Sequence, residues 1–210
     1  MPKQFIIAVM SRWTFWLRAE SLSLLLNNGV HHLYINVEQV RAFRTCSFFI
    51  SCEPPLILGG LKLNRSVLKF GGSSVSDFTK IKNIAEMLKT RVEQGEELIV
   101  VVSAMGKTTD QLMENVSTLT STPKDQELAL LLTTGEQQTV SYLSMVLNDI
   151  SVKAKAMTGY QAGIKTIGHH LKSKIAEINP DTFNQAFENN DVLVVAGFQG
   201  INDEFELTTL

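Results

Sequence analysis

The spacing of apolar residues becomes regular only after residue 65 of this 210-residue chain. From there on, short segments that are apolar throughout alternate with longer segments in which apolar residues recur every three or four positions. Unbroken apolar segments are typical of strands buried on both faces of a parallel sheet, and the three-to-four spacing is typical of helices that cover such a sheet. The pattern therefore predicts an α/β fold, an αβα sandwich with a mainly parallel sheet and helices on both of its faces.

The expected elements follow one another as strand, helix and strand. Strands are predicted over residues 66–70, 97–103, 152–157 and 191–198, and helices over residues 78–92, 108–119, 126–132, 137–147, 170–178 and 180–189. Residues 76–77 are expected to cap the first helix and Gly95 to end it. The second helix is expected to turn Leu112, Val116 and Leu119 toward the core.

The first 60 residues have a different character. They contain both tryptophans and both cysteines of the chain, and no helix or strand period is sustained in them. We expect residues 1–60 to be an N-terminal extension that is irregular or not native to the domain, with the natural start near residues 61–64. The alternative is an accessory segment that is helical over residues 13–26. Residues 61–210 would then hold the folded domain.

Composition and charge narrow the class of protein. The formal net charge is −2, and no run of Lys or Arg marks a surface for nucleic acid. The longest early apolar run, residues 5–10, is too short to span a bilayer, so we expect no membrane segment. Because Cys46 and Cys52 are the only cysteines, the sequence does not resemble an oxidised secreted scaffold, and we expect a cytoplasmic protein.

Segments rich in glycine, serine and threonine follow three of the predicted strands, at residues 71–74, 103–109 and 197–200. Ligands of open parallel sheets bind beyond the carboxyl ends of the strands, where backbone amides and hydroxyl groups can approach a phosphate closely. The first segment also follows a lysine, Lys69, inside its strand. We therefore predict an anion site at this edge. Neither a P-loop spacing nor a dinucleotide fingerprint is present, which disfavours a Walker-type ATPase and a Rossmann dehydrogenase.

Each of these residues also has a purely structural interpretation. Two glycines after a strand often form only a turn, and Lys69 can extend into solvent from the edge of the sheet. Ser103 and Thr109 are expected to cap the helix that follows, whatever else they do. Glu136 lies beside a glycine between two predicted helices, where an acid can interact with a helix dipole.

Five short motifs, taken in order, resemble those of the aspartate kinases of the amino-acid kinase superfamily. They are KFGGSSV at residues 69–75, VVSAMG at 101–106 with two threonines at 108–109, TGE at 134–136, GYQAGI at 159–164 and VAGFQG at 195–200. The resemblance runs from residue 66 to residue 210 and implies the amino-acid kinase fold, N-terminal part only. Uridylate, acetylglutamate and glutamate kinases share this fold, but Phe70 and the Gly-Glu motif favour aspartate kinase.

The resemblance also implies a reaction and the residues that serve it. The reaction would be ATP-dependent phosphorylation of the side-chain carboxylate of L-aspartate to 4-phospho-L-aspartate, with Mg²⁺, the first step of lysine, threonine and methionine biosynthesis. Lys69 would stabilise the charge on the transferring phosphoryl group, and Glu136 would bind the amino group of aspartate. The implied ATP- and phosphate-binding residues are Lys69, Phe70, Gly71, Gly72 and Ser73. The implied substrate-binding residues are Ser103, Thr109 and Glu136, and we expect no protein ligand to a metal.

Members of this family continue into a Gly-Arg-Gly-Gly-Ser-Asp stretch, a lobe that binds the nucleotide base and paired regulatory domains. These parts would follow the last residues of this chain. We therefore expect a C-terminally truncated member that is inactive alone and whose complete enzyme is a homo-oligomer. The alternatives are another member of the superfamily, or a non-catalytic fragment that associates with a full-length subunit.

Overall fold

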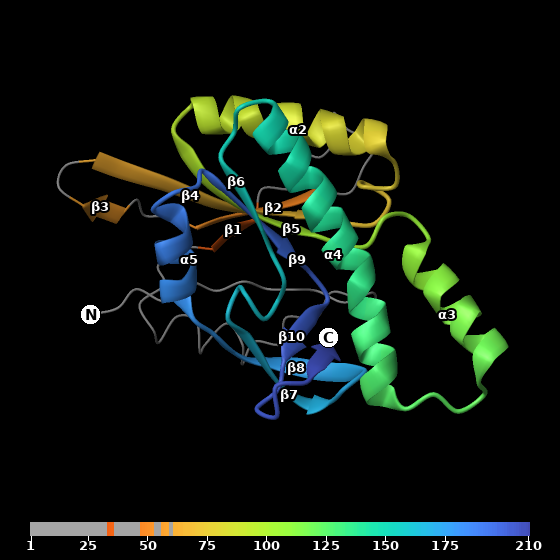
Figure 1. Ribbon diagram of the computed structural model, residues 1–210. Coiled ribbons are helices and arrows are strands. Elements are labelled where there is room, and N and C mark those ends of the chain that lie inside the picture. The colour runs from red at the N-terminus through yellow and green to blue at the C-terminus, as the bar shows by residue number, and fades with distance from the viewer. Residues whose placement is uncertain (1–32, 36–46, 53–55, 59–60) are drawn as a thin grey trace.

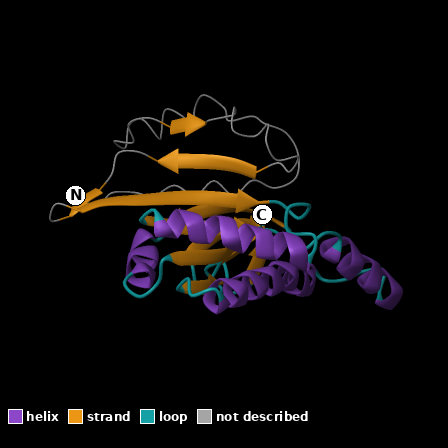
Figure 2. Ribbon diagram, turned by 90° about the horizontal axis from the view of Figure 1, so that it is seen from above, coloured by secondary structure: helices purple, strands orange, loops and turns teal. Residues whose placement is uncertain are grey.

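The computed structural model describes residues 33–35, 47–52, 56–58 and 61–210, with side chains from residue 65 onward. Its centre is a mixed sheet in which four neighbouring strands run parallel (Figure 1). Figure 2 shows two long helices lying along one side of this sheet. The predicted α/β fold with a parallel sheet is confirmed.

The parallel strands are β4 (Leu61–Phe70), β5 (Glu96–Val102), β9 (Val192–Ala196) and β6 (Ala154–Met157), side by side in that order. Three short strands precede β4 in the chain. Two of them pair antiparallel with β4, namely β2 (Ser47–Cys52) and β3 (Leu56–Leu58), and β1 (Leu33–Ile35) pairs antiparallel with β2. They belong to residues 1–60, and the prediction that this segment is not native to the domain stays a prediction. The helix predicted over residues 13–26 lies outside the described residues.

Helices cover both faces of the parallel strands, as their apolar spacing predicts. On one face, Leu68 of β4 packs with Leu88 of α2 (Phe78–Glu93) and Leu143 of α4 (Asp125–Asp149). On the other face, Val195 of β9 packs with Phe183 of α5 (Pro180–Phe187). Burying each such side chain contributes roughly 1.5–3 kcal/mol. None of the helices in the described part of the chain is long and apolar enough to cross a membrane.

Helix α2 has the ends that its flanking residues predict. The Asp77 side chain accepts a hydrogen bond from the backbone N–H of Lys80 (2.9 Å), which satisfies a donor that the helix itself leaves unpaired. Gly95, just past the helix, has a φ of +84°, a left-handed conformation that glycine adopts without a steric penalty. Both end signals are therefore confirmed.

One continuous helix, α4, replaces the two helices predicted over residues 126–132 and 137–147, so that prediction is wrong. The hydroxyl groups of Thr133 and Thr134 donate to carbonyls of the preceding turn, at Leu130 and Leu131, and leave the helix unbroken. Gly135 is helical as well. Its presence reflects close packing against a neighbouring loop, described below, and not a break in the helix.

A second, smaller sheet contains β11 (Leu207–Thr209), β10 (Gln199–Ile201), β7 (Ile164–His169) and β8 (Lys172–Ile178), in that order. The helix predicted over residues 170–178 is wrong, because residues 172–178 form β8, antiparallel to β7. One buried position of β8 is polar: the hydroxyl of Ser173 donates to Oγ1 of Thr208 (3.0 Å). A polar residue in the buried row hides the alternation by which a strand is predicted.

Helix α3 (Thr108–Leu119) has the bounds that the sequence predicts but packs less than expected. It extends away from the rest of the fold (Figure 1), and none of its residues is buried. Leu112 and Val116 are half-buried, whereas Leu119 is 84% exposed, so its predicted inward position is wrong. The amphipathic spacing identified the helix correctly, but the last turn of α3 is left open to solvent.

Candidate active site

The segment after β4 is a compact turn whose two glycines have different surroundings. The carbonyl of Gly71 accepts hydrogen bonds from the N–H groups of Ser74 (2.9 Å) and Val75 (3.3 Å). A Cβ on Gly72 would lie 2.9 Å from the carbonyl oxygen of Ala104, so a side chain has no room there. Among the described residues, a Cβ on Gly71 would meet no heavy atom within 4 Å. The space beside Gly71 is therefore open, and an anion can approach the backbone there.

The next residues attach this turn to the N-terminus of α2. The Lys80 ammonium donates to the carbonyl of Ser73 (2.9 Å) and to the hydroxyl of Ser76 (2.8 Å). The hydroxyl of Ser74 is buried and has no hydrogen-bond partner among the described residues. The N-terminus of a helix carries a partial positive charge and unpaired N–H groups. The Asp77 carboxylate already caps one donor of the α2 N-terminus, and the turn that precedes it leaves space for an anionic group beside Gly71.

Backbone hydrogen bonds join the three glycine-containing segments at one edge of the sheet. The N–H of Ser103 donates to the carbonyl of Phe70 (3.1 Å), and the N–H of Gly106 donates to the carbonyl of Gly72 (3.1 Å). The N–H of Gly197 donates to the carbonyl of the last residue of β5 (2.9 Å). The structure thus brings the segments that follow β4 and β5 into direct contact and ties the segment after β9 to the end of β5.

Glu136 reaches the same edge from the middle of α4. Its side chain is 3% exposed, and its Oε1 accepts a hydrogen bond from the N–H of Ala104 (3.1 Å). Its Oε2 is buried without a hydrogen-bond partner among the described residues. Burial raises the pKa of Glu136 to about 7, although the hydrogen bond from Ala104 opposes the shift. Because Glu136 lies in mid-helix, it is not the first-turn acid considered above.

Gly135 explains how Glu136 can reach the backbone of the β5–α3 loop. A Cβ on Gly135 would lie 2.8 Å from the Cβ of Ala104, closer than two such carbons approach in proteins. The absence of a side chain at this position therefore lets α4 lie directly against the loop. The glycine that seemed to interrupt a helix is required for its packing.

Lys69 and Phe70, which the family resemblance places at the phosphates, occupy opposite faces of β4. Phe70 is 3% exposed and belongs to the core beneath α2, so only its backbone lies at the site. Side chains alternate along a strand, so Lys69 lies on the other face, level with Val101 of β5. Lys69 is half-buried. Its length allows the ammonium to extend beyond the end of the strand.

Ser103 and Thr109 are both half-buried, at the end of β5 and in the first turn of α3. The prediction that they cap α3 is wrong. The helix begins after Lys107 without a side-chain cap, and the hydroxyl of Thr108 donates to the carbonyl of Met105 (2.7 Å). The backbone of Ser103 adjoins the turn after β4, whereas Thr109 lies in the first turn of α3.

The sequence predicted no separate role for Gln199, a buried polar residue at the start of β10. Its Nε2 donates to the carbonyl of Thr133 (3.0 Å), one helical turn before Glu136. A glutamine within a glycine-rich segment gives no periodic signal of burial, so only the structure identifies it.

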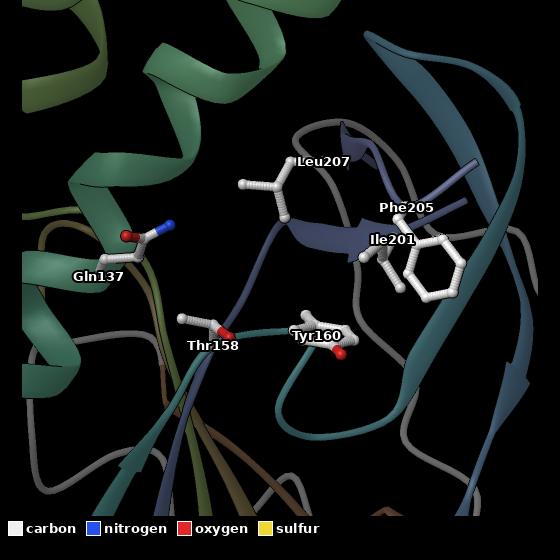
Figure 3. Close-up of a pocket in the computed structure, with 6 residues that line it drawn as sticks. All are labelled: Gln137, Thr158, Tyr160, Ile201, Phe205 and Leu207. Carbon is white, nitrogen blue, oxygen red and sulfur yellow. The ribbon is translucent and has the colours of Figure 1, made fainter. Parts of the chain in front are cut away.

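A hollow of about 410 Å³ lies beside α4, on the side of Gln137 (Figure 3). Its lining residues are Gln137, Thr158, Tyr160, Ile201, Phe205 and Leu207. The lining is mainly apolar or aromatic, and Tyr160 and Phe205 are themselves exposed. This composition suits an apolar group better than a phosphate.

Comparison with known proteins places these features in a family. Residues 64–209 match the family model described as "Amino acid kinase family". Aspartokinase 2 of Bacillus subtilis is 41% identical over 144 residues, which are 69% of this chain and 35% of that protein. The crystal structure of aspartate kinase from Synechocystis covers 68% of this chain and 23% of its own, with 38% identity and a TM-score of 0.55. E. coli aspartokinase III, solved in complex with aspartate and ADP, covers 68% of this chain and 42% of its own; at 17% identity and a TM-score of 0.56 it shows the fold alone.

These matches confirm the resemblance to aspartate kinases that the five motifs indicate. The chain spans about a third of the length of the curated relatives it matches, 35% in the case of the Bacillus subtilis protein. The family match begins at residue 64, where the spacing of apolar residues becomes regular, and it includes every segment of the site described above. This chain belongs to the amino acid kinase family.

Proposed function

We propose that this chain forms the phosphate- and substrate-binding part of an aspartate kinase. The proposed reaction transfers the γ-phosphoryl group of ATP to the side-chain carboxylate of L-aspartate, giving 4-phospho-L-aspartate and ADP, the first step of lysine, threonine and methionine biosynthesis. The single observation that carries the proposal is the buried carboxylate of Glu136, of which one oxygen has no partner among the described residues and the other accepts from the loop that contacts the turn after β4. The identity of about 40% with aspartokinases supports the choice of substrate.

Glu136 is proposed to bind the ammonium group of aspartate through Oε2. A buried carboxylate is costly unless a cation or hydrogen-bond donors accompany it. An ammonium group at Oε2 would supply both, and it would lower the pKa of Glu136 from its raised value of about 7. Protonation of Glu136 removes the negative charge, so aspartate affinity is expected to fall as the pH falls below neutral.

The turn after β4 is proposed to hold the phosphates of ATP. The space at Gly71, the N-terminus of α2 and the buried hydroxyl of Ser74, which has no partner among the described residues, fit an anionic group. Lys69 would stabilise negative charge on the transferring phosphoryl group, and positioning and charge stabilisation are what phosphoryl transfer chiefly requires. In the step itself, a carboxylate oxygen of aspartate forms the new P–O bond while the bond to ADP breaks. The carboxylate is ionised near neutral pH, so no general base is assigned.

The nucleotide is proposed to enter as its Mg²⁺ complex. The described residues contain no cluster of three or more His, Cys, Asp or Glu side chains that could hold a metal ion, so no protein ligand is assigned to it. A cytoplasmic location and homo-oligomerisation of the complete enzyme belong to the same proposal and rest on the family resemblance.

Calorimetric titration with L-aspartate and with succinate tests the role of Glu136, because succinate is the same dicarboxylate without the ammonium group. The wild-type chain is expected to bind aspartate and to discriminate against succinate. Glu136→Gln keeps an oxygen that can accept from Ala104 but removes the charge, so it should lose most of that discrimination. Glu188→Gln, at an exposed position after α5, is the matched control.

Two results would contradict the proposal. One is aspartate binding by Glu136→Gln that equals that of the wild type. The other is a wild-type chain that binds aspartate no better than succinate, since the residues described here would then not hold the substrate.

A further inference from the structure

Gln199 is a fully buried side chain at the junction of the two sheets and α4. It is the first residue of β10, and its exposure is 0%. Only the short connection after β9 precedes it. Burying a primary amide is unfavourable unless its donor and acceptor are both used. A buried glutamine is therefore informative about what its two polar atoms contact.

Both polar atoms of the Gln199 amide have backbone partners on different elements. Nε2 donates to the carbonyl of Thr133 in α4 (3.0 Å), and Oε1 accepts from the N–H of Gly159 (3.4 Å), in the segment after β6. Thr133 is itself in mid-helix, where its carbonyl accepts from the N–H four residues later. Gln199 thus uses the second lone pair of that carbonyl and leaves the helix intact.

Close backbone packing shows that this junction is tight. A Cβ on Gly159 would clash with the backbone carbonyl of Gln199, so the segment after β6 can approach only with a glycine at this position. On another side of α4, the Cβ of Ala104 leaves no room for a side chain on Gly135. The helical turn from Thr133 to Glu136 therefore contacts the β5–α3 loop through Gly135 and Glu136, and it contacts Gln199 through Thr133.

We propose that Gln199 is a positioning residue, whose amide fixes the Thr133–Glu136 turn of α4 and so sets the position of the Glu136 carboxylate beside the N–H of Ala104. An apolar side chain of similar length would fill the same volume, but it could neither donate to Thr133 nor accept from Gly159. Hydrogen bonds are directional, so the amide specifies where the helix lies along its axis as well as how close it comes. A binding group must be held to within a fraction of an ångström by such supporting contacts. The identity of the ligand, L-aspartate, is the only part of this inference that rests on the proposed function.

The first test needs no ligand. In the full chain, the amide chemical shift of Ala104 is followed by NMR while the pH is changed across the titration of Glu136, since the two groups share a hydrogen bond. Gln199→Met removes both amide contacts, and Gln199→Asn keeps an amide that is too short to make them. Both variants are expected to reduce the amplitude of the Ala104 titration by about half or more, because hydrogen bonds weaken steeply as their geometry departs from ideal. Gln185→Met, exposed on α5, is the matched control and should leave the amplitude unchanged.

The second readout is the affinity for L-aspartate by calorimetry. The two Gln199 variants are expected to bind aspartate about tenfold more weakly or worse, by analogy with the loss that follows removal of a partner that orients a metal ligand. Because Gln199→Asn retains a polar amide, it provides the comparison if Gln199→Met does not fold. An Ala104 amplitude in the Gln199 variants equal to that of the wild type, or an Ala104 shift that does not follow Glu136 in the wild type, would overturn the inference. A wild-type chain that fails to bind aspartate would instead count against the proposed function and leave the NMR comparison valid.

Discussion

Gly135→Ala is a substitution for which two physical effects predict opposite changes in stability. In a helix interior, alanine is more favourable than glycine by about 1 kcal/mol, so helix propensity alone predicts a more stable protein. The added Cβ would lie 2.8 Å from the Cβ of Ala104, and neither carbon can move without its backbone. Overpacking typically costs about 1–3 kcal/mol. We therefore expect a net loss of up to about 2 kcal/mol in the free energy of unfolding, because the packing effect outweighs the gain in propensity.

A double-mutant cycle measured by urea unfolding isolates the contact. Ala104→Gly removes the opposing methyl group, so in that background Gly135→Ala should lose its penalty and keep the gain in propensity. The coupling free energy between the two positions is expected to be about 1–3 kcal/mol, within the range found for residues in contact. A single Gly135→Ala variant that is more stable than the wild type, with no coupling to position 104, would refute the packing argument.

Three further predictions concern the turn, the buried acid and the exposed helix. Gly71→Ala should change the unfolding free energy by less than about 0.5 kcal/mol, because its Cβ would meet no atom of the described residues and its φ is not left-handed. It should nevertheless weaken ATP binding in calorimetry, and an unchanged affinity for ATP would contradict the proposed phosphate site. Gly72→Ala should instead lower the midpoint of thermal unfolding, because its Cβ would meet the carbonyl of Ala104. The pKa of Glu136 is raised from 4.5 to about 7 on folding, so its ionised form destabilises the fold fully above pH 7 and the penalty disappears as the pH falls toward 4.5. Glu136→Gln should therefore stabilise the chain by up to about 3 kcal/mol near pH 8 and by little near pH 4. Urea denaturation at a series of pH values checks this, and a stabilisation that does not change with pH would argue against a buried carboxyl with a raised pKa. Leu119→Ser, at the exposed end of α3, should change the unfolding free energy by less than about 0.5 kcal/mol.

The sequence predicted the parallel strands and the α2 helix well because their signals are local. The unbroken apolar runs of β5 and β9 need no knowledge of their partners, and the N-cap Asp77 and the terminal Gly95 act within one turn of the helix they bound. The positions of the glycine-rich segments after the strands also predicted that these segments meet at one edge of the sheet. Strand order and the hydrogen bonds between the segments required the structure.

The failures have one physical origin, which is tertiary contact that overrides a local signal. Gly135 suggested a helix break, but it is present because Ala104 leaves no room for a side chain. Ser173 obscured the strand period of β8, because its buried hydroxyl is satisfied by Thr208 on a strand far along the chain. The role of Gln199 depends on two backbone partners, each at least 40 residues away in sequence. No window of local sequence contains that information.

The loop after β5 contacts both halves of the site, since the N–H of Ala104 bonds Glu136 and the N–H of Gly106 bonds Gly72. A displacement of this loop therefore alters the anion side and the acid side together. The two sides are linked in the thermodynamic sense, and such linkage is reciprocal. By whatever factor an anion at residues 71–73 changes the proton affinity of Glu136, a proton on Glu136 changes the affinity for that anion by the same factor. The backbone of residues 104–106 is thus the contact through which the two proposed half-sites would be coupled.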